Sequence, residues 1–292
     1  MATYEAAITK ALDSQKDLKA DAEHCCADPA RLATIGRAVD QQVRVYRTPQ
    51  DFGLYTVSEV RPEAVDSIVR MGCSGRERLG TQEEFPGVVD AQVPRSSLSE
   101  TRARAEGELI ERLADDGQQA QLIAIAPHGG DIEPNTDLQA ERVATRLDAK
   151  SVSSWRCKGW KPGGGAFDRW HITSTDLNEA SFPRLARVMG RGFTHAVAFH
   201  GFGREEVLIG GTAPPELKSL VCQAIDSAIG SVIRVRVATP EDHFGGDDPC
   251  NIVNRLTAGG TGGLQIEQSL EARERFWGTI AEAVAEIYDT VI

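Results

Sequence analysis

The pattern of apolar and polar positions is clearest in the second part of the chain. Short apolar runs recur there, and most are separated by segments with helical spacing. The runs are LIAIA (122–126), SVSSW (151–155), HAVAFHGF (195–202), VLIGG (207–211), VIRVRVA (232–238) and GGLQIEQS (262–269). The intervening helices are expected at 136–147, after Pro183, at 215–229 and at 271–290. Strands alternating with helices predict an α/β domain over residues 118–292, with a largely parallel sheet.

Residues 1–117 have a different pattern. Helices are expected at about 4–24 and 29–43, and strands at 53–61 and 67–72. Ser99 is a candidate cap for a helix that ends near Gly117. We interpret this part as an N-terminal α+β extension packed on the α/β body, since no low-complexity linker separates the two.

Candidate chemistry lies where the first apolar run of the α/β domain ends. The segment LIAIAPHGGDIE stops being apolar at Pro127, and His128 and Glu133 follow at once. In an open α/β sheet, residues just past the carboxyl end of a strand line the ligand crevice. Zinc accepts histidine and carboxylate ligands, and a catalytic zinc takes three ligands from the protein and leaves one position for water.

The third ligand is expected to be His200, which ends the apolar run AVAF in the same way. A glycine follows both His128 and His200, so a metal or substrate can approach the backbone closely. The alternative is that both are core histidines that donate to carbonyl groups. Two histidines at equivalent strand ends, with Glu133 beside one of them, favour a metal site formed by His128, Glu133 and His200.

Glu267 is the candidate general base. It lies in LQIEQS, where Leu264 and Ile266 alternate with Gln265 and Glu267. A glutamate beside zinc-bound water is the usual proton acceptor in amide hydrolysis. The alternative is a solvent-facing side chain on a half-exposed strand, but the position near the end of an α/β strand favours the catalytic role.

Four further residues are candidates for binding substrate. Arg255 can hold a carboxylate through two parallel hydrogen bonds, although an ion pair with a nearby acid is an equal alternative. Asn251 and Asn254 either orient the substrate or close the turn that contains them. His171 either binds substrate, for example at a developing oxyanion, or is a core histidine.

Composition narrows the class of protein. The chain has 292 residues, a net charge of −11 and a pI near 5.1, which argues against nucleic acid as a general partner. The six cysteines show no CxxC spacing and are expected to be reduced thiols. No apolar stretch would span a bilayer, and the N-terminus lacks a secretory signal, so we expect a cytoplasmic protein without a membrane partner.

The ordered set APHGGDIE, HITST, AFHGF, VLIGG, NIVNR and LQIEQS resembles the poly-γ-glutamate hydrolase family of phage and bacteria, which are zinc-carboxypeptidase-like hydrolases. The resemblance covers roughly residues 120–290. It implies a mixed, open sheet between helices, zinc on His128, Glu133 and His200, and Glu267 as the base. It also implies Arg255 as a ligand for the substrate carboxylate. Residues 1–117 and the Trp- and Gly-rich segment 153–170 depart from the phage pattern.

Three hypotheses for the function follow. The first is a zinc-dependent hydrolase that cleaves γ-glutamyl or similar acidic peptide-like amide bonds, in a polymeric or small-molecule substrate. The second is a zinc-dependent deacylase of small N-acyl amino acids, which the same ligands would serve. The third is a non-catalytic interaction protein, for which His128 and His200 would lie far apart. The oligomeric state is left open.

Overall fold

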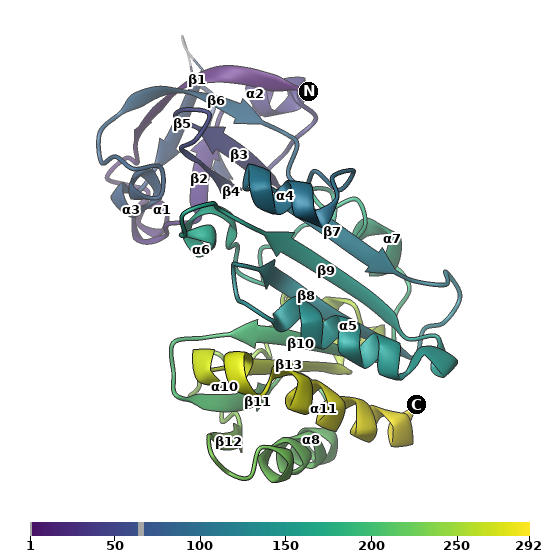
Figure 1. Cartoon of the computed structure of the whole chain (residues 1–292). Coiled ribbons are helices and arrows are strands. Elements are labelled where there is room, and N and C mark those ends of the chain that lie inside the picture. Colours follow the sequence, from purple (N-terminus) through teal and green to yellow (C-terminus); the bar gives the residue numbers. More distant parts are fainter. Residues whose placement is uncertain (1, 64–66) are drawn as a thin grey trace. The chain divides into compact units, whose positions relative to one another are not determined.

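The computed structural model describes residues 2–63 and 67–292, and the chain forms two compact units. The first comprises Met1–Arg95 and Gly163–Pro183, and the second comprises Ser96–Pro162 and Arg184–Ile292. Both units are therefore built from two separate stretches of chain. Figure 1 traces the elements of each in sequence colours.

The first unit is a closed β-barrel. Its strands lie in the order β1-β5-β2-β4-β3-β6, and β6 pairs antiparallel with β1 to close it. The strands are β1 Thr3–Lys10, β2 His24–Ala27, β3 Gln42–Tyr46, β4 Phe52–Val60, β5 Ile68–Met71 and β6 Phe85–Asp90. Short helices accompany them: α1 Lys16–Ala20, α2 Pro29–Thr34, α3 Cys73–Glu77 and, from the second stretch, α6 Ala166–Trp170.

The long helices expected at 4–24 and 29–43 are wrong except for two short helices within those ranges, α1 and α2. In β1, the buried residues Ala6 and Ile8 alternate with more exposed ones, which is the two-residue period of a strand. Cys25, Leu32 and Val43 each contribute to the interior of the barrel. The barrel needs several short segments that each turn apolar side chains inward, and this tertiary demand overrides the weak helical spacing.

The second unit has a seven-stranded sheet in the order β12-β11-β13-β10-β8-β9-β7. The strands are β7 Leu109–Ala114, β8 Leu122–Gly130, β9 Ser153–Gly159, β10 His195–Gly201, β11 Glu206–Gly210, β12 Arg234–Val237 and β13 Gly263–Gln268. The central strands β13, β10, β8 and β9 are mutually parallel, whereas β7 pairs antiparallel with β9 and β11 pairs antiparallel with β13. The prediction of a mixed, largely parallel open sheet is confirmed.

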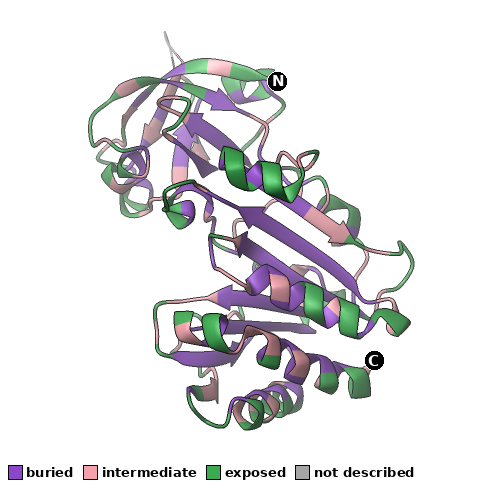
Figure 2. Cartoon of the chain, in the orientation of Figure 1, coloured by how far each residue is buried: buried purple, intermediate pink, exposed green. Residues whose placement is uncertain are grey.

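Three helices cover one face of this sheet: α5 Thr136–Arg146, α8 Pro215–Ala228 and α11 Trp277–Val291 (Figure 1). Their apolar stripes pack on alternate strand residues such as Val197, Phe199, Leu264 and Ile266. Figure 2 shows buried strands beneath helices whose outer faces are exposed. The remaining short helices are α4 Glu100–Glu106, α7 Ala186–Met189, α9 Ile252–Arg255, α10 Leu270–Arg275 and the 3₁₀ turns Asp148–Lys150 and Ala258–Gly260. No helix of the described residues is long and apolar enough to cross a membrane.

The division between the units differs from the boundary expected after residue 117. Ser99 does cap α4, but that helix ends at Gly107, whose φ of 67° is typical of a helix end. The chain then forms β7, an edge strand of the sheet, and Glu111 of β7 accepts a hydrogen bond from Trp155 Nε1 at 2.9 Å. The segment 96–117 therefore belongs to the α/β unit.

Candidate active site

A β-bulge in β8 orients His128. Ala126 pairs with Arg156 of β9 and Gly129 pairs with Lys158, so Pro127 and His128 together lie opposite one residue. Ala126 faces the helix-covered core, and a Cβ on Gly129 would lie 2.5 Å from Asp137 of α5, on the same side. The extra residue thus turns His128 to the opposite face of the sheet.

His200 and Glu267 lie on that same face. Their strand neighbours Phe199 and Ile266 point into the helix-covered core, so the alternation directs His200 and Glu267 away from it. The parallel strands β10 and β13 place His200 and Glu267 in direct register. Three side chains from three adjacent strand ends therefore share one face.

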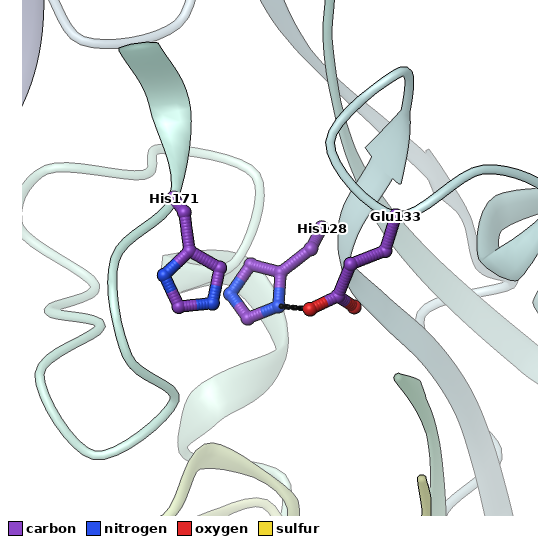
Figure 3. Close-up of side chains that lie close together, drawn as sticks. All are labelled: His128, Glu133 and His171. Carbon is purple, nitrogen blue, oxygen red and sulfur yellow. Dashed lines mark hydrogen bonds and ion pairs between the residues drawn. The ribbon is translucent and has the colours of Figure 1, made fainter. Parts of the chain in front are cut away.

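The Nδ1 atoms of His128 and His200 and the carboxylate of Glu133 lie close together. Nδ1 of His128 lies 3.1 Å from Oε1 of Glu133 (Figure 3) and 3.2 Å from Nδ1 of His200. Nδ1 of His200 lies 3.5 Å from Oε2 of Glu133. Ligands held about 2.0–2.1 Å from a tetrahedral metal ion are about 3.3 Å apart, and the distances between these atoms are close to that value.

Glu133 is fixed by the loop between β8 and α5. Its backbone N–H donates to His128 O at 2.8 Å, and Thr136 Oγ1 donates to its carbonyl at 2.9 Å. The N–H of Gly201, at the end of β10, donates to Oε2 at 3.0 Å. Burial disfavours the charged form of this carboxylate. The charges and hydrogen bonds of the His128 and His200 imidazoles favour the charged form more strongly, and they hold the pKa of Glu133 well below its usual range.

The pKa of Glu267 is shifted in the opposite direction to that of Glu133. Burial and, next, the charge of Glu133 raise its pKa well above the usual range. Oε1 of Glu267 accepts a hydrogen bond from Gln265 Nε2 at 3.0 Å.

Sequence reasoning missed Arg273 of α10. This buried guanidinium donates through Nη1 to Pro134 O at 3.1 Å, while its backbone carbonyl accepts from Asn135 Nδ2 at 2.9 Å. A Cβ on Gly201 would lie 2.4–2.7 Å from the Arg273 side chain. Arg273 therefore stabilises the loop that carries Glu133 through these two hydrogen bonds. No motif marks it, because its contacts with the Glu133 loop form only when α10 packs beside that loop.

The asparagines predicted near the site serve the loop before β13. Asn254 donates through Nδ2 to Gly246 O and Asp248 O, both at 2.8 Å, and its Oδ1 accepts from Thr212 Oγ1. Asn251 caps α9 through Oδ1. These contacts correspond to the alternative in which both asparagines close the turn. Arg255 ends α9 at half-buried exposure, and its role stays a prediction.

His171 belongs to the first unit, as part of the stretch Gly163–Pro183. Its Nδ1 forms a short hydrogen bond with Glu23, and its ring stacks on Phe167 at 4.2 Å between centroids. The same stretch is bound to the barrel by His24, whose Nε2 lies 2.6 Å from Asp176 Oδ2. A substrate-binding role for His171 stays a prediction.

The fold and the site together define an α/β protein with two histidines and two glutamates gathered at the ends of its central strands. Residues 96–289 match the model of the family described as poly-gamma-glutamate hydrolase. The chain belongs to the poly-gamma-glutamate hydrolase family.

Two solved structures and one known protein sequence are similar to this chain. The solved structure of a bacteriophage poly-gamma-glutamate hydrolase has a TM-score of 0.51 and 28% identity, covering 63% of this chain and 89% of that one. The zinc-free form of YndL has a TM-score of 0.50 and 21% identity, with 63% and 90% covered, and shares the fold. The SPbeta prophage-derived protein YoqZ of Bacillus subtilis is 24% identical over 165 residues, which are 56% of this chain. This chain spans about half the length of YoqZ, 54%.

Proposed function

We propose that this chain is a zinc-dependent hydrolase that cleaves γ-glutamyl or similar acidic peptide-like amide bonds. One observation carries the proposal. The two Nδ1 atoms and the Glu133 carboxylate lie within 3.1–3.5 Å of one another, and Glu267 lies in register with His200 on the same face. Two histidines and one glutamate form a donor set used by catalytic zinc sites.

Zinc bound to His128, Glu133 and His200 would polarise the scissile carbonyl and lower the pKa of the attacking water. Glu267 takes the proton from that water and delivers it to the nitrogen of the leaving amine as the C–N bond breaks. Gly201 N–H and Arg273 hold the Glu133 loop in place during these steps. The backbone of the bulge and of the Glu133 loop keeps the ligand atoms aligned before substrate binds.

Family membership and the 28% identity to the phage enzyme support a γ-glutamyl substrate. The net charge of −11 repels a polyanion at long range, so recognition of its carboxylates must be local. Arg255 is our candidate for that contact, because a guanidinium binds a carboxylate through two parallel hydrogen bonds.

The other two hypotheses receive less support. A deacylase of small N-acyl amino acids would use the same ligands, and no feature of the described residues favours it over the γ-glutamyl substrate. The non-catalytic alternative expected His128 and His200 to lie far apart, whereas their Nδ1 atoms are 3.2 Å apart.

The experiment combines metal analysis with hydrolysis of poly-γ-glutamate and of N-acyl amino acids. We expect one zinc per chain and release of new amino groups from the polymer. Glu267→Gln should lower kcat by at least about 10³-fold and retain zinc, whereas His200→Ala should lose both zinc and activity. Glu286→Gln, on the exposed face of α11, is the matched control and should behave as the wild type.

Protein without bound zinc, or activity that survives in Glu267→Gln, would contradict the mechanism. If N-acyl amino acids are hydrolysed in preference to the polymer, the proposed γ-glutamyl substrate is wrong, whereas the proposed zinc-dependent mechanism is retained.

A further inference from the structure

A chain of side-chain amides ends on Glu267. Asn251 Nδ2 donates to Gln265 Oε1 at 2.8 Å, and Gln265 Nε2 donates to Glu267 Oε1 at 3.0 Å. All three residues are buried, at 5–6% exposure. Gln265 and Glu267 lie two positions apart on β13 and therefore point to the same face of the sheet. The amide chain connects the cap of α9 to the candidate general base.

The direction of the hydrogen bonds is set by the backbone. Val253 N–H donates to Asn251 Oδ1 at 3.2 Å, so Asn251 must present its Nδ2 group to Gln265. Gln265 then receives this donor on Oε1, which leaves Nε2 toward Glu267. An N–H group therefore always faces the carboxylate, because each amide in the chain has one donor end and one acceptor end.

The loop before β13 packs closely on the side chain of Gln265 and keeps its amide between Asn251 and Glu267. Gly246, at a φ of 69°, packs on it so closely that a Cβ would lie 2.8–3.0 Å from the Gln265 side chain. Phe244 O also faces Nε2 at 3.4 Å. Asn254 holds this loop by donating to Gly246 O. The loop before β13 thus forms a close-fitting wall around the amide of Gln265.

We propose that Asn251 and Gln265 are positioning residues for Glu267. They occupy Oε1 with a hydrogen bond and so leave Oε2 as the oxygen that takes the proton from water and passes it to the leaving amine. This inference rests on the proposed function, in which Glu267 is the base. Neither amide touches the reacting atoms, and their effect on the reaction passes through the orientation of one carboxylate.

The decisive variant is Asn251→Asp. Aspartate caps a helix as well as asparagine does, so α9 keeps its cap and the fold is retained. The new carboxylate has no donor for Gln265, whose amide must turn Nε2 toward residue 251 and Oε1 toward Glu267. Two acceptors then face each other. We expect kcat to fall about 10–100-fold, with KM, zinc content and Tm near wild-type values.

Gln265→Met supplies the second arm, because methionine fills similar space without an amide. It should lower kcat to a similar extent, and adding Asn251→Asp to it should have no further effect, since the two changes interrupt one chain. Asn178→Asp, in the first unit, introduces the same charge elsewhere and should leave kcat unchanged. The side-chain amide resonance of Gln265 in NMR spectra, assigned through its loss in Gln265→Met, should shift in Asn251→Asp.

Equal kcat in Asn251→Asp and wild type would overturn the inference, as would an undiminished effect of Asn251→Asp in the Gln265→Met background. An unshifted Gln265 amide resonance would overturn it as well. An active wild type combined with any of these results leaves the proposed function standing. A wild type that hydrolyses nothing would overturn the proposed function and this inference together.

Discussion

The two glutamates of the site show how strongly position decides the chemistry of one residue type. Glu133 is buried between two imidazoles and its pKa lies well below the usual range, whereas burial and the charge of Glu133 raise the pKa of Glu267. Their residue type and their place after apolar runs were predictable from the sequence. The roles of Glu133 as a metal ligand and of Glu267 as the base stay predictions, and the opposite pKa shifts of the two carboxyl groups depend on neighbours that only the tertiary structure supplies.

A histidine of the first unit, His24, gives the protein a pH-dependent stability. The hydrogen bond to Asp176, opposed by burial and aided by Asp21, raises the pKa of His24. The stabilisation is fully present below the unfolded pKa of about 6.5 and is lost as pH rises through the raised folded pKa. We expect His24→Gln to lower the free energy of unfolding by about 1 kcal/mol near pH 6 and by much less near pH 9.

Urea denaturation at the two pH values measures this difference. His243→Gln, which replaces an exposed histidine, is the control and should leave stability within about 0.5 kcal/mol of wild type. A His24→Gln effect of the same size at both pH values would contradict the assignment.

At the scale of the element, the bulge in β8 is the feature that strand patterning did not anticipate. The run LIAIAP predicts a strand that ends near Pro127, and strict alternation would direct His128 to the same face as Ala124 and Ala126. The extra residue reverses that direction. Its cause is tertiary, since Gly129 must lie against Asp137 of α5 while β9 continues the pairing.

Gly129→Ala tests this packing. The added Cβ would lie 2.5 Å from Asp137 Cβ and 3.1 Å from Cys157 O, and neither atom can move without shifting α5 or β9. We expect a loss of about 1–3 kcal/mol in the free energy of unfolding, measured by chemical denaturation. Gly190→Ala meets no atom within 4 Å and should have little effect. Equal stability of the two variants would show that the bulge tolerates a side chain.

Element prediction succeeded for the continuous apolar strands and amphipathic helices of the second unit and failed where the first unit required closure of a barrel. The strands β8, β10 and β13 and the helices α5 and α8 all follow their apolar spacing closely. In the first unit, β1 has only two buried positions and β2 has only four residues, and their pairing with β5, β6 and β4 makes them strands.

At the scale of the whole molecule, charge governs how an anionic polymer would approach. The net charge of −11 repels poly-γ-glutamate over about one Debye length, roughly 10 Å at 0.1 M salt. We expect kcat/KM for the polymer to rise several-fold as salt increases from about 10 to about 150 mM. A short γ-glutamyl peptide of low charge should change much less in the same assay. A fall in kcat/KM with salt would instead indicate that a local cationic site dominates binding.

The sequence by itself determined the α/β class of the second unit, the family, and the placement of His128, Glu133, His200 and Glu267 near strand ends, because apolar periodicity and strand-end position are local properties. The tertiary structure decided what depends on contacts between distant segments. In the tertiary structure the stretch Gly163–Pro183 belongs to the first unit, and the barrel of that unit is closed. The bulge in β8 directs His128 to the opposite face of the sheet. Arg273 and the side-chain amides of Asn251 and Gln265 lie at the site. Arg273 and Pro134 are 139 positions apart, and even Asn251 and Gln265 are 14 apart, which is beyond the repeat of a helix or strand, so no local pattern records these contacts.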